Sequence, residues 1–268
     1  MRTSKVEDTE SGLHDEAGNL KVALVTGASR GIGRAIALAL AKAGTRIIIH
    51  YGRSASEADS LRKQIQAVGG LAETVAADVA SPDGVAELAQ QVRELAGDRL
   101  DVLVANAGIS RAASIEDDTV QDFDSLFATN VRAPFFLVQQ LLPLLGEGSS
   151  VVLVSSLAAR FAFVGPPGSL SLPGYASTKG ALDTLVKHFG ALLGPRGIRT
   201  IALAPGVIET DMSNLTKTEA GRDLALGMQA LKRSGPPSDI VDVIAFVAAD
   251  AARWITGAII PVDRGSKL

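Results

Sequence analysis

Tyr175 and Lys179 stand four residues apart, so a helix over this segment would place the phenol and the ammonium on one face. A tyrosine with a pKa of about 10 donates a proton poorly at neutral pH unless a neighbouring positive charge stabilises the phenolate. Lys179 is placed to supply that charge. Because such pairs also occur on solvated helix faces, a role in proton transfer to a carbonyl needs support from elsewhere in the chain.

Three upstream segments give that support. They are Thr26-Gly-Ala-Ser-Arg-Gly-Ile-Gly33, Asn106-Ala-Gly108, and Ser155-Ser156 at the end of an apolar run. With Tyr175 and Lys179, in this order, they make the chain resemble the classical short-chain dehydrogenase/reductase family from Lys21 onward, including its members similar to 3-oxoacyl carrier-protein reductase. The resemblance implies hydride transfer between a nicotinamide cofactor and a carbonyl or secondary alcohol.

The composition fits one large domain. The chain has 268 residues, of which 47% are hydrophobic, enough for a sheet covered on both faces but not for a second catalytic domain. We expect residues 1–20, which are polar and acidic, to form a flexible extension. Residues 21–268 are predicted to form a single Rossmann-fold catalytic domain.

Charge and residue usage argue against several other classes. A net charge of -3 without a basic stripe makes nucleic acid a poor partner. The absence of cysteine excludes disulfides, thiolate metal sites and a cysteine nucleophile. His14, His50 and His188 lie far apart in the sequence, so no metal site is predicted.

We expect a soluble, cytoplasmic protein without membrane binding, because no apolar run approaches the roughly 18 residues that span a bilayer. Residues 1–20 also lack the apolar core of a signal peptide. The terminal Ser266-Lys-Leu268 matches a peroxisomal address, which would matter only in a eukaryotic protein. We interpret this match as a coincidence.

Short apolar runs alternate with longer segments of helical spacing. Continuous apolarity within the runs is typical of strands buried on both faces of a parallel sheet. The predicted strands are 22–25, 45–49, 73–77, 102–105, 151–154, 200–204 and 258–262, and the predicted helices are 32–43, 57–68, 82–95, 124–145, 175–193 and 238–249. This pattern predicts an α/β fold, a single doubly wound Rossmann domain with a mostly parallel seven-stranded sheet flanked by helices.

Two segments are predicted to be irregular and to carry substrate specificity. The 18 residues between Ser156 and Tyr175 contain Gly165-Pro-Pro-Gly168 and are typical of a loop, longer than family members usually have there. The region from about 211 to 237 resembles the family's mobile substrate-binding segment.

A strand, a glycine-rich turn and a helix N-terminus follow one another between residues 22 and 33, which is the order of a dinucleotide site. Glycines let the backbone approach a pyrophosphate, and the free N–H groups and the helix dipole favour its charge. A lone glycine cluster would more often be a tight turn. The residues predicted to bind here are Gly27, Ser29, Arg30, Gly31, Ile32 and Gly33.

The end of the second predicted strand favours NADP(H) over NAD(H). An NAD-preferring relative would carry an acid near Tyr51 to bind the ribose hydroxyls, and none is present. Arg53 and Ser54 lie just beyond Tyr51, and Arg30 occupies a position that is basic in many NADP-dependent relatives. A charge-assisted hydrogen bond from an arginine to the 2′-phosphate would contribute about 1.5–3 kcal/mol.

Further cofactor contacts are implied by the resemblance alone. They are Asp78 and Val79 for the adenine, Asn106, Ala107 and Gly108 beside the adenosine ribose, and Pro205, Gly206, Ile208 and Thr210 for the nicotinamide carboxamide. Asn106 and the turn at 205–206 would also stabilise strand ends, a role that accompanies cofactor binding in the family.

The resemblance implies a catalytic group of Asn130, Ser156, Tyr175 and Lys179. Tyr175 would be the general acid in carbonyl reduction and the base in alcohol oxidation. Lys179 would lower the pKa of Tyr175 and bind the nicotinamide ribose, and Ser156 would hydrogen-bond the substrate oxygen. Asn130 would support a water link to Lys179, although an asparagine inside a helix also has the alternative of a local backbone bond.

Substrate identity stays open. A reductase of small free carbonyl compounds ranks first and a 3-oxoacyl carrier-protein reductase second, because residues 139–147 lack the basic residues with which such reductases dock their carrier. Arg196 is a remaining candidate contact for an acidic carrier. The third alternative is an NADP(H)-binding sensor or scaffold, which would have no chemical need for the complete catalytic group.

A homotetramer or homodimer is expected. Relatives assemble through their fourth and fifth helices, and the apolar surfaces of 133–145 and 181–193 suit that arrangement. The same surfaces would alternatively cover the sheet.

Overall fold

The computed structural model describes residues 20–113, 115–162, 172–210, 213, 217–233 and 235–266. The predicted extension 1–20 therefore lies outside the described residues except for Leu20. So do the last two residues of the C-terminal tripeptide and half of the long loop before Tyr175, residues 163–171.

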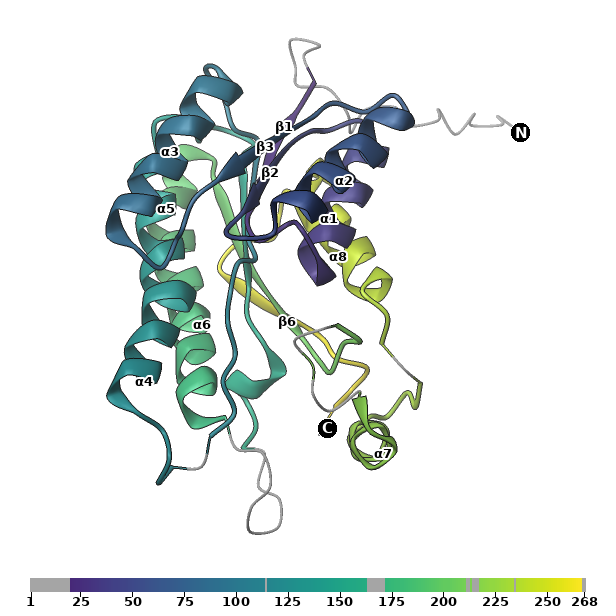
Figure 1. The fold of residues 1–268 in the computed structure, drawn as a ribbon. Coiled ribbons are helices and arrows are strands. Elements are labelled where there is room, and N and C mark those ends of the chain that lie inside the picture. The colour runs from purple at the N-terminus through teal and green to yellow at the C-terminus, as the bar shows by residue number, and fades with distance from the viewer. Residues whose placement is uncertain are drawn as a thin grey trace, which may run out of the picture.

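A seven-stranded sheet forms the centre of the molecule (Figure 1), as the sequence predicted. The strands are β1 (Val22–Val25), β2 (Arg46–Tyr51), β3 (Ala72–Ala76), β4 (Val102–Ala105), β5 (Ser150–Val154), β6 (Arg199–Pro205) and β7 (Ala258–Val262). Their order is β3-β2-β1-β4-β5-β6-β7, and every strand pairing is parallel. The chain reverses its direction of travel across the sheet after β3, which places a crevice between β1 and β4.

Helices cover both faces of the sheet (Figure 1). On one face lie α1 (Gly31–Lys42), α2 (Ala55–Ala67) and α8 (Ser238–Ala248), and on the other lie α3 (Pro82–Ala96), α4 (Val120–Phe127), α5 (Ala133–Leu141) and α6 (Pro173–Leu193). Each face has its own apolar core. Ile47 and Ile49 of β2 point into one core and Ile48 into the other, because side chains alternate along a strand.

The predicted helix 124–145 is wrong as a single element. The structure has α4, then a π-helical segment (Ala128–Arg132), then α5. Pro134 has no N–H, so the α-helical bond to the carbonyl of Asn130 cannot form. The Asn130 side chain meanwhile binds the backbone of Ile109, outside the helix. Both features favour a local widening of the helix at this point.

A further helix, α7 (Glu219–Met228), lies in the region predicted to be irregular (Figure 1). Thr218 caps it, since its hydroxyl accepts a hydrogen bond of 3.1 Å from the Gly221 N–H. Glu219 in the first turn complements the helix dipole. This capping pattern is visible in the sequence and would have identified the helix.

The other predicted elements are confirmed, and their ends differ from the predicted ones by at most two residues. Within the described ranges, no helix combines the length and the apolarity that a membrane span requires.

Candidate active site

The predicted site residues come together at the carboxyl ends of the parallel strands. Thr26 and Gly27 follow β1, Asn106 follows β4 and Ser156 follows β5 by two residues. Because the sheet is parallel, these ends meet along one edge, beside the crevice between β1 and β4. This edge is the ligand-binding edge of doubly wound folds.

The glycine-rich turn after β1 is tightly folded. Gly27 and Gly31 adopt φ values of 62° and 57°, in the left-handed region that favours glycine. A Cβ atom on Gly33 would lie 2.5 Å from both the Asn106 Nδ2 atom and the Gly27 carbonyl oxygen. Arg30, the N-cap of α1, forms no side-chain cap. The N–H groups of the first turn are thus left for an anion.

Thr26 and Asn106 brace this turn. The Thr26 hydroxyl accepts hydrogen bonds of 3.0 Å and 2.9 Å from the N–H groups of Asn106 and Ala107. The Asn106 side-chain amide donates in return to the Thr26 carbonyl at 2.8 Å. Asn106 therefore shapes the turn, whereas the predicted contact with the adenosine ribose stays a prediction.

His50 is a feature of the site that the sequence reasoning missed. It is the penultimate residue of β2 and is 1% exposed. Its ring lies between Gly27 and Ala77, with a hydrogen bond of 3.1 Å on each side. A histidine that follows three isoleucines in a strand, close to a glycine-rich turn, was the available signal.

Two exposed arginines flank the region after β2. Arg30 lies at the N-terminus of α1 and Arg53 lies in the turn before α2. The Ser54 hydroxyl, at the N-cap of α2, makes no cap hydrogen bond. The pKa of Glu57 is lowered, mainly by a hydrogen bond with its own backbone, next by one with Ser56, and to a smaller extent by the charge of Arg30. Arg30 and Glu57 thus lie close enough to interact.

The remaining predicted cofactor residues border the same edge. The Asp78 carboxylate accepts a hydrogen bond of 3.0 Å from the Ala80 N–H, and Val79 beside it is buried. At the other side, a Cβ atom on Gly31 would lie 3.6 Å from the Thr210 methyl group. The segment that follows β6 therefore reaches the glycine-rich turn, as expected for residues that share one dinucleotide. Pro205 is the last residue of β6, and Gly206 and Ile208 belong to the segment that follows it.

Tyr175 and Ser156 interact directly. Tyr175 lies in the first turn of α6, and Ser156 caps the short 3-10 turn Leu157–Ala159 through a hydrogen bond from the Ala158 N–H. Burial raises the pKa of Tyr175, and a hydrogen bond with the Ser156 side chain opposes this rise. The predicted lowering of this pKa by Lys179 is not among the effects that act here. The phenol is therefore protonated at neutral pH.

Lys179 is buried one turn further along α6. Its ammonium donates a hydrogen bond of 2.7 Å to the Val154 carbonyl and lies 5.6 Å from the centre of the Tyr175 ring. A Cβ atom on Gly108 would lie 3.7 Å from the same ammonium, so the turn after β4 reaches it too. Burial lowers the pKa of Lys179 to about 8, and the charge of Asp183 opposes this shift.

Asn130 lies at the centre of the π-helical segment and is 1% exposed. Its side-chain oxygen accepts from the Ile109 N–H at 2.9 Å, and its amide donates to the Ile109 carbonyl at 2.9 Å and to the Thr178 hydroxyl at 3.0 Å. Thr178 directly precedes Lys179. Asn130 thus joins the turn after β4 to the helix that carries Tyr175 and Lys179. Both N–H groups of its side-chain amide are used in these hydrogen bonds.

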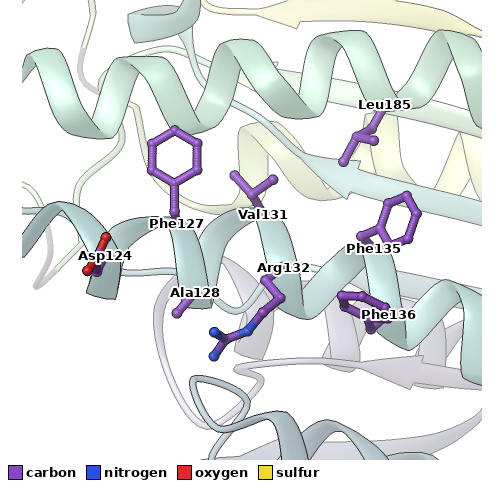
Figure 2. A pocket seen from close by; sticks show the side chains of 8 residues that line it. All are labelled: Asp124, Phe127, Ala128, Val131, Arg132, Phe135, Phe136 and Leu185. Atoms are coloured by element: carbon purple, nitrogen blue, oxygen red, sulfur yellow. The ribbon is translucent and has the colours of Figure 1, made fainter.

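A shallow groove of about 500 Å³ lies elsewhere, on the outer surface of α4, the π-helical segment and α5 (Figure 2). Phe127, Val131, Phe135 and Phe136 line it, together with Leu185 of α6. None of the predicted site residues lines this groove. It is therefore separate from the candidate active site.

Comparisons with known proteins agree with this geometry. A family model described as enoyl-(acyl carrier protein) reductase matches residues 27–267. A versicolorin reductase of Emericella nidulans is 38% identical over 257 residues, covering 92% of this chain and 95% of the relative. The chain belongs to the classical short-chain dehydrogenase/reductase family, whose members are oxidoreductases.

Two solved structures are similar over the same part of the chain. An angucycline C-6 ketoreductase with bound NADP has a TM-score of 0.84 and 38% identity, covering 92% of this chain and 95% of that one. A short-chain dehydrogenase from Burkholderia cenocepacia in complex with NADP has a TM-score of 0.84 and 36% identity, covering 92% and 97%.

Proposed function

We propose that this protein is an NADP(H)-dependent oxidoreductase that transfers a hydride between the nicotinamide and a carbonyl or secondary alcohol, with Tyr175 as general acid and base. The observation that carries the proposal is the convergence of Tyr175, Ser156 and Lys179 on the edge of the sheet that holds the glycine-rich turn. When bound, the cofactor supplies the hydride in reduction and accepts it in oxidation.

The pKa of Tyr175 supports the proposed sequence of steps. Tyr175, whose pKa is raised by burial, stays protonated and holds the proton that a carbonyl oxygen needs. Ser156 donates a hydrogen bond to that oxygen as charge develops on it. The Lys179 ammonium favours the phenolate once the proton has left, which is when its charge matters most. Lys179 also binds the nicotinamide ribose, as its family counterpart does.

Asn130 supports the return of a proton to Lys179 through its backbone carbonyl. Both N–H groups of its side-chain amide are used by Ile109 and Thr178. Its backbone carbonyl lacks an α-helical donor, because residue 134 is a proline. In this proposal that carbonyl holds a water molecule, the link to Lys179 that the family resemblance implies.

NADP(H) is the cofactor in this proposal, in preference to NAD(H). Arg30 and Arg53 are exposed near the end of β2, and residues 47–56 include no acidic residue that would repel a 2′-phosphate. Both structural neighbours described above carry NADP. The glycine-rich turn has the free N–H groups and close backbone approach that a dinucleotide needs.

We infer that the substrate is a free ketone. The versicolorin reductase and the angucycline ketoreductase make versicolorin-type and angucycline-type ketones the first compounds to test, ahead of small carbonyl compounds. Carrier-bound substrates rank lower. Arg196, the remaining candidate contact for a carrier, donates to the carbonyls of Leu142 and Leu145 and thus stabilises the end of α5.

The test is the initial rate of NADPH oxidation over a panel of ketones, β-ketoesters, quinones and a 3-oxoacyl carrier protein, with Tyr175→Phe measured alongside. We expect a free ketone to give the highest rate and the variant to lose it. Tight NADPH binding without turnover on any compound would instead identify a non-catalytic binder. A preference for the carrier-bound substrate would overturn the free-ketone assignment.

The proposal extends to a homodimer or homotetramer built on the groove of Figure 2. Phe136 is 43% exposed there, and Asp124 and Arg132 lie along the same groove. A two-fold interface brings one surface against itself, so a groove that has an acid, a base and an apolar floor is complementary to a second copy. The expected surface 133–145 includes part of this groove, and Leu185 belongs to the expected surface 181–193.

A further inference from the structure

His50 joins two segments that border the predicted dinucleotide site. Its Nδ1 atom lies 3.1 Å from the Gly27 backbone nitrogen, in the turn after β1. Its Nε2 atom lies 3.1 Å from the Ala77 carbonyl oxygen, directly before Asp78 and Val79. Its own carbonyl accepts a hydrogen bond of 2.9 Å from the Ala28 N–H. The residue therefore holds the glycine-rich turn through both its backbone and its side chain.

The two ring contacts require one tautomer. The Gly27 N–H is a donor, so Nδ1 must accept and carry no proton. The Ala77 carbonyl is an acceptor, so Nε2 must carry the proton and donate. A doubly protonated ring would direct a second N–H at the Gly27 N–H. Both bonds exist together only in the neutral imidazole with its proton on Nε2.

We propose that His50 is a positioning residue for the cofactor, which as a neutral Nε2–H imidazole sets the distance between the glycine-rich turn and the segment after β3. Gly27 belongs to the turn that would hold the pyrophosphate, and Asp78 and Val79 belong to the segment expected beside the adenine. A dinucleotide must reach both at once, so the separation of these two segments controls its affinity.

Burial keeps the ring neutral. Burial lowers the pKa of His50 to about 4, while the hydrogen bond to Ala77 and the charge of Asp78 oppose this shift. Asp78 is the charged side chain that acts on the ring within the described part of the chain, and Gly27 and Ala28 face it with backbone N–H groups. The link therefore persists across the neutral range.

The first test is the tautomer itself, read by two-bond ¹H–¹⁵N NMR of ¹⁵N-histidine-labelled protein without cofactor. We expect the His50 signals to be those of a ring protonated on Nε2, and we expect them not to change between pH 5.5 and 8. A proton on Nδ1, or a titration within that range, would overturn the proposal. This readout does not depend on catalysis, so it is independent of whether the proposed reaction is correct.

The second test is the dissociation constant for NADPH, measured by fluorescence of the bound nicotinamide. His50→Leu removes both contacts, and we expect it to weaken binding about ten-fold or more, a loss on the scale of one buried hydrogen bond. His50→Asn keeps an acceptor close to the Nδ1 position, and His50→Gln keeps a donor close to the Nε2 position. Each should bind NADPH more tightly than His50→Leu does.

The kinetic signature separates positioning from a general loss of structure. The KM for NADPH should rise in His50→Leu while kcat at saturating NADPH stays within about two-fold of the parent's. His188→Leu, a substitution of an exposed histidine on α6, is the matched control and should change neither quantity. If folded His50→Leu binds NADPH as tightly as the parent, the proposal is wrong. If His50→Leu fails to fold, the tautomer seen by NMR and the NADPH affinities of His50→Asn and His50→Gln test the proposal instead.

Discussion

The Ser155 hydroxyl donates a hydrogen bond of 2.6 Å to the Asp183 carboxylate, while the adjacent Ser156 interacts with Tyr175. Two consecutive serines after β5 thus serve different partners. Asp183 lies one turn after Lys179 on α6, and its charge raises the pKa of Lys179 against the effect of burial. Asp183 therefore supplies part of the negative charge that lets a buried ammonium exist beside Tyr175.

Asp183→Asn is expected to shift the alkaline limb of the kcat profile to lower pH. The substitution keeps an oxygen for Ser155 but removes the charge, so the pKa of Lys179 should fall further below its present value of about 8. A shift of up to about one pH unit is the scale for one nearby charge. The measurement is kcat against pH from 6 to 10.

Arg160→Met provides the opposite control. The Arg160 guanidinium lies 3.8 Å from Asp183 and partly offsets its charge. Removing this positive charge should leave the alkaline limb unchanged or move it to higher pH. A limb that moves to lower pH in both variants would mean that disturbed packing, not the charge of Asp183, causes the shift.

Lys179→Met should abolish turnover and yet leave the protein at least as stable as the parent at pH 7. Burial lowers the pKa of Lys179 from 10.5 to about 8, so at pH 7 the fold carries the cost of an ammonium that would be better solvated in the unfolded chain. Between about pH 8 and 10.5, Lys179 is deprotonated in the folded state but still protonated in the unfolded chain, because its pKa is lowered by folding. The stability of the parent should therefore rise with pH across this range. Thermal unfolding of both proteins at pH 7 and 9.5 tests this.

His50 should make the free energy of unfolding of the parent fall as the pH becomes acidic. Its pKa falls from 6.5 in the unfolded chain to about 4, so the unfolded state binds the proton first as the pH drops. Stability should decline between about pH 6.5 and 4, by roughly 3 kcal/mol in total from this group. Urea unfolding of His50→Asn should show a smaller decline, and an equal decline in the two proteins would contradict the assignment.

Cofactor preference should respond to charges of both signs near the end of β2. Arg53→Ala and Arg30→Ala are each expected to weaken NADPH binding about ten-fold while changing NADH binding little. Glu57→Gln removes the acid that interacts with Arg30 and should strengthen NADPH binding. Dissociation constants for both cofactors decide this, and an arginine variant with unaltered preference would remove that arginine from the site.

Phe136→Glu is expected to weaken or abolish self-association. It places a charge on the apolar floor of the groove in Figure 2, where two copies would meet. Multi-angle light scattering at several concentrations should show a smaller species than the parent. Phe246→Glu, an exposed phenylalanine on α8 at the other face of the sheet, serves as the comparison. A parent that is itself monomeric would rule out the interface.

The parts of this structure that the sequence predicted are those fixed by local pattern. The seven strands are mainly apolar runs, and the glycines of the turn after β1 indicate a backbone with positive φ values. The role of Asn130 was harder to predict, because its partner Ile109 lies 21 residues away and the contact exists only in the folded chain. The contacts of Asp183 with Ser155 and of His50 with Gly27 likewise join residues that lie 28 and 23 positions apart. Pro134 and Thr218 were local signals of the helix break and of α7.

The π-helical segment Ala128–Arg132 also determines which changes of length this chain can tolerate. A π turn holds one residue more than an α turn, so the segment absorbs an extra residue without rotating α5 against α4. Deleting one residue there would narrow the π turn to an α turn, with Pro134 still leaving one helical hydrogen bond unmade. It would keep the buried faces of α4 and α5 in register and withdraw Asn130 from Ile109. The same deletion inside α6 would turn all later side chains by about 100°. Residues 128–132 are thus a place where a single-residue deletion would spare the fold and still inactivate the site.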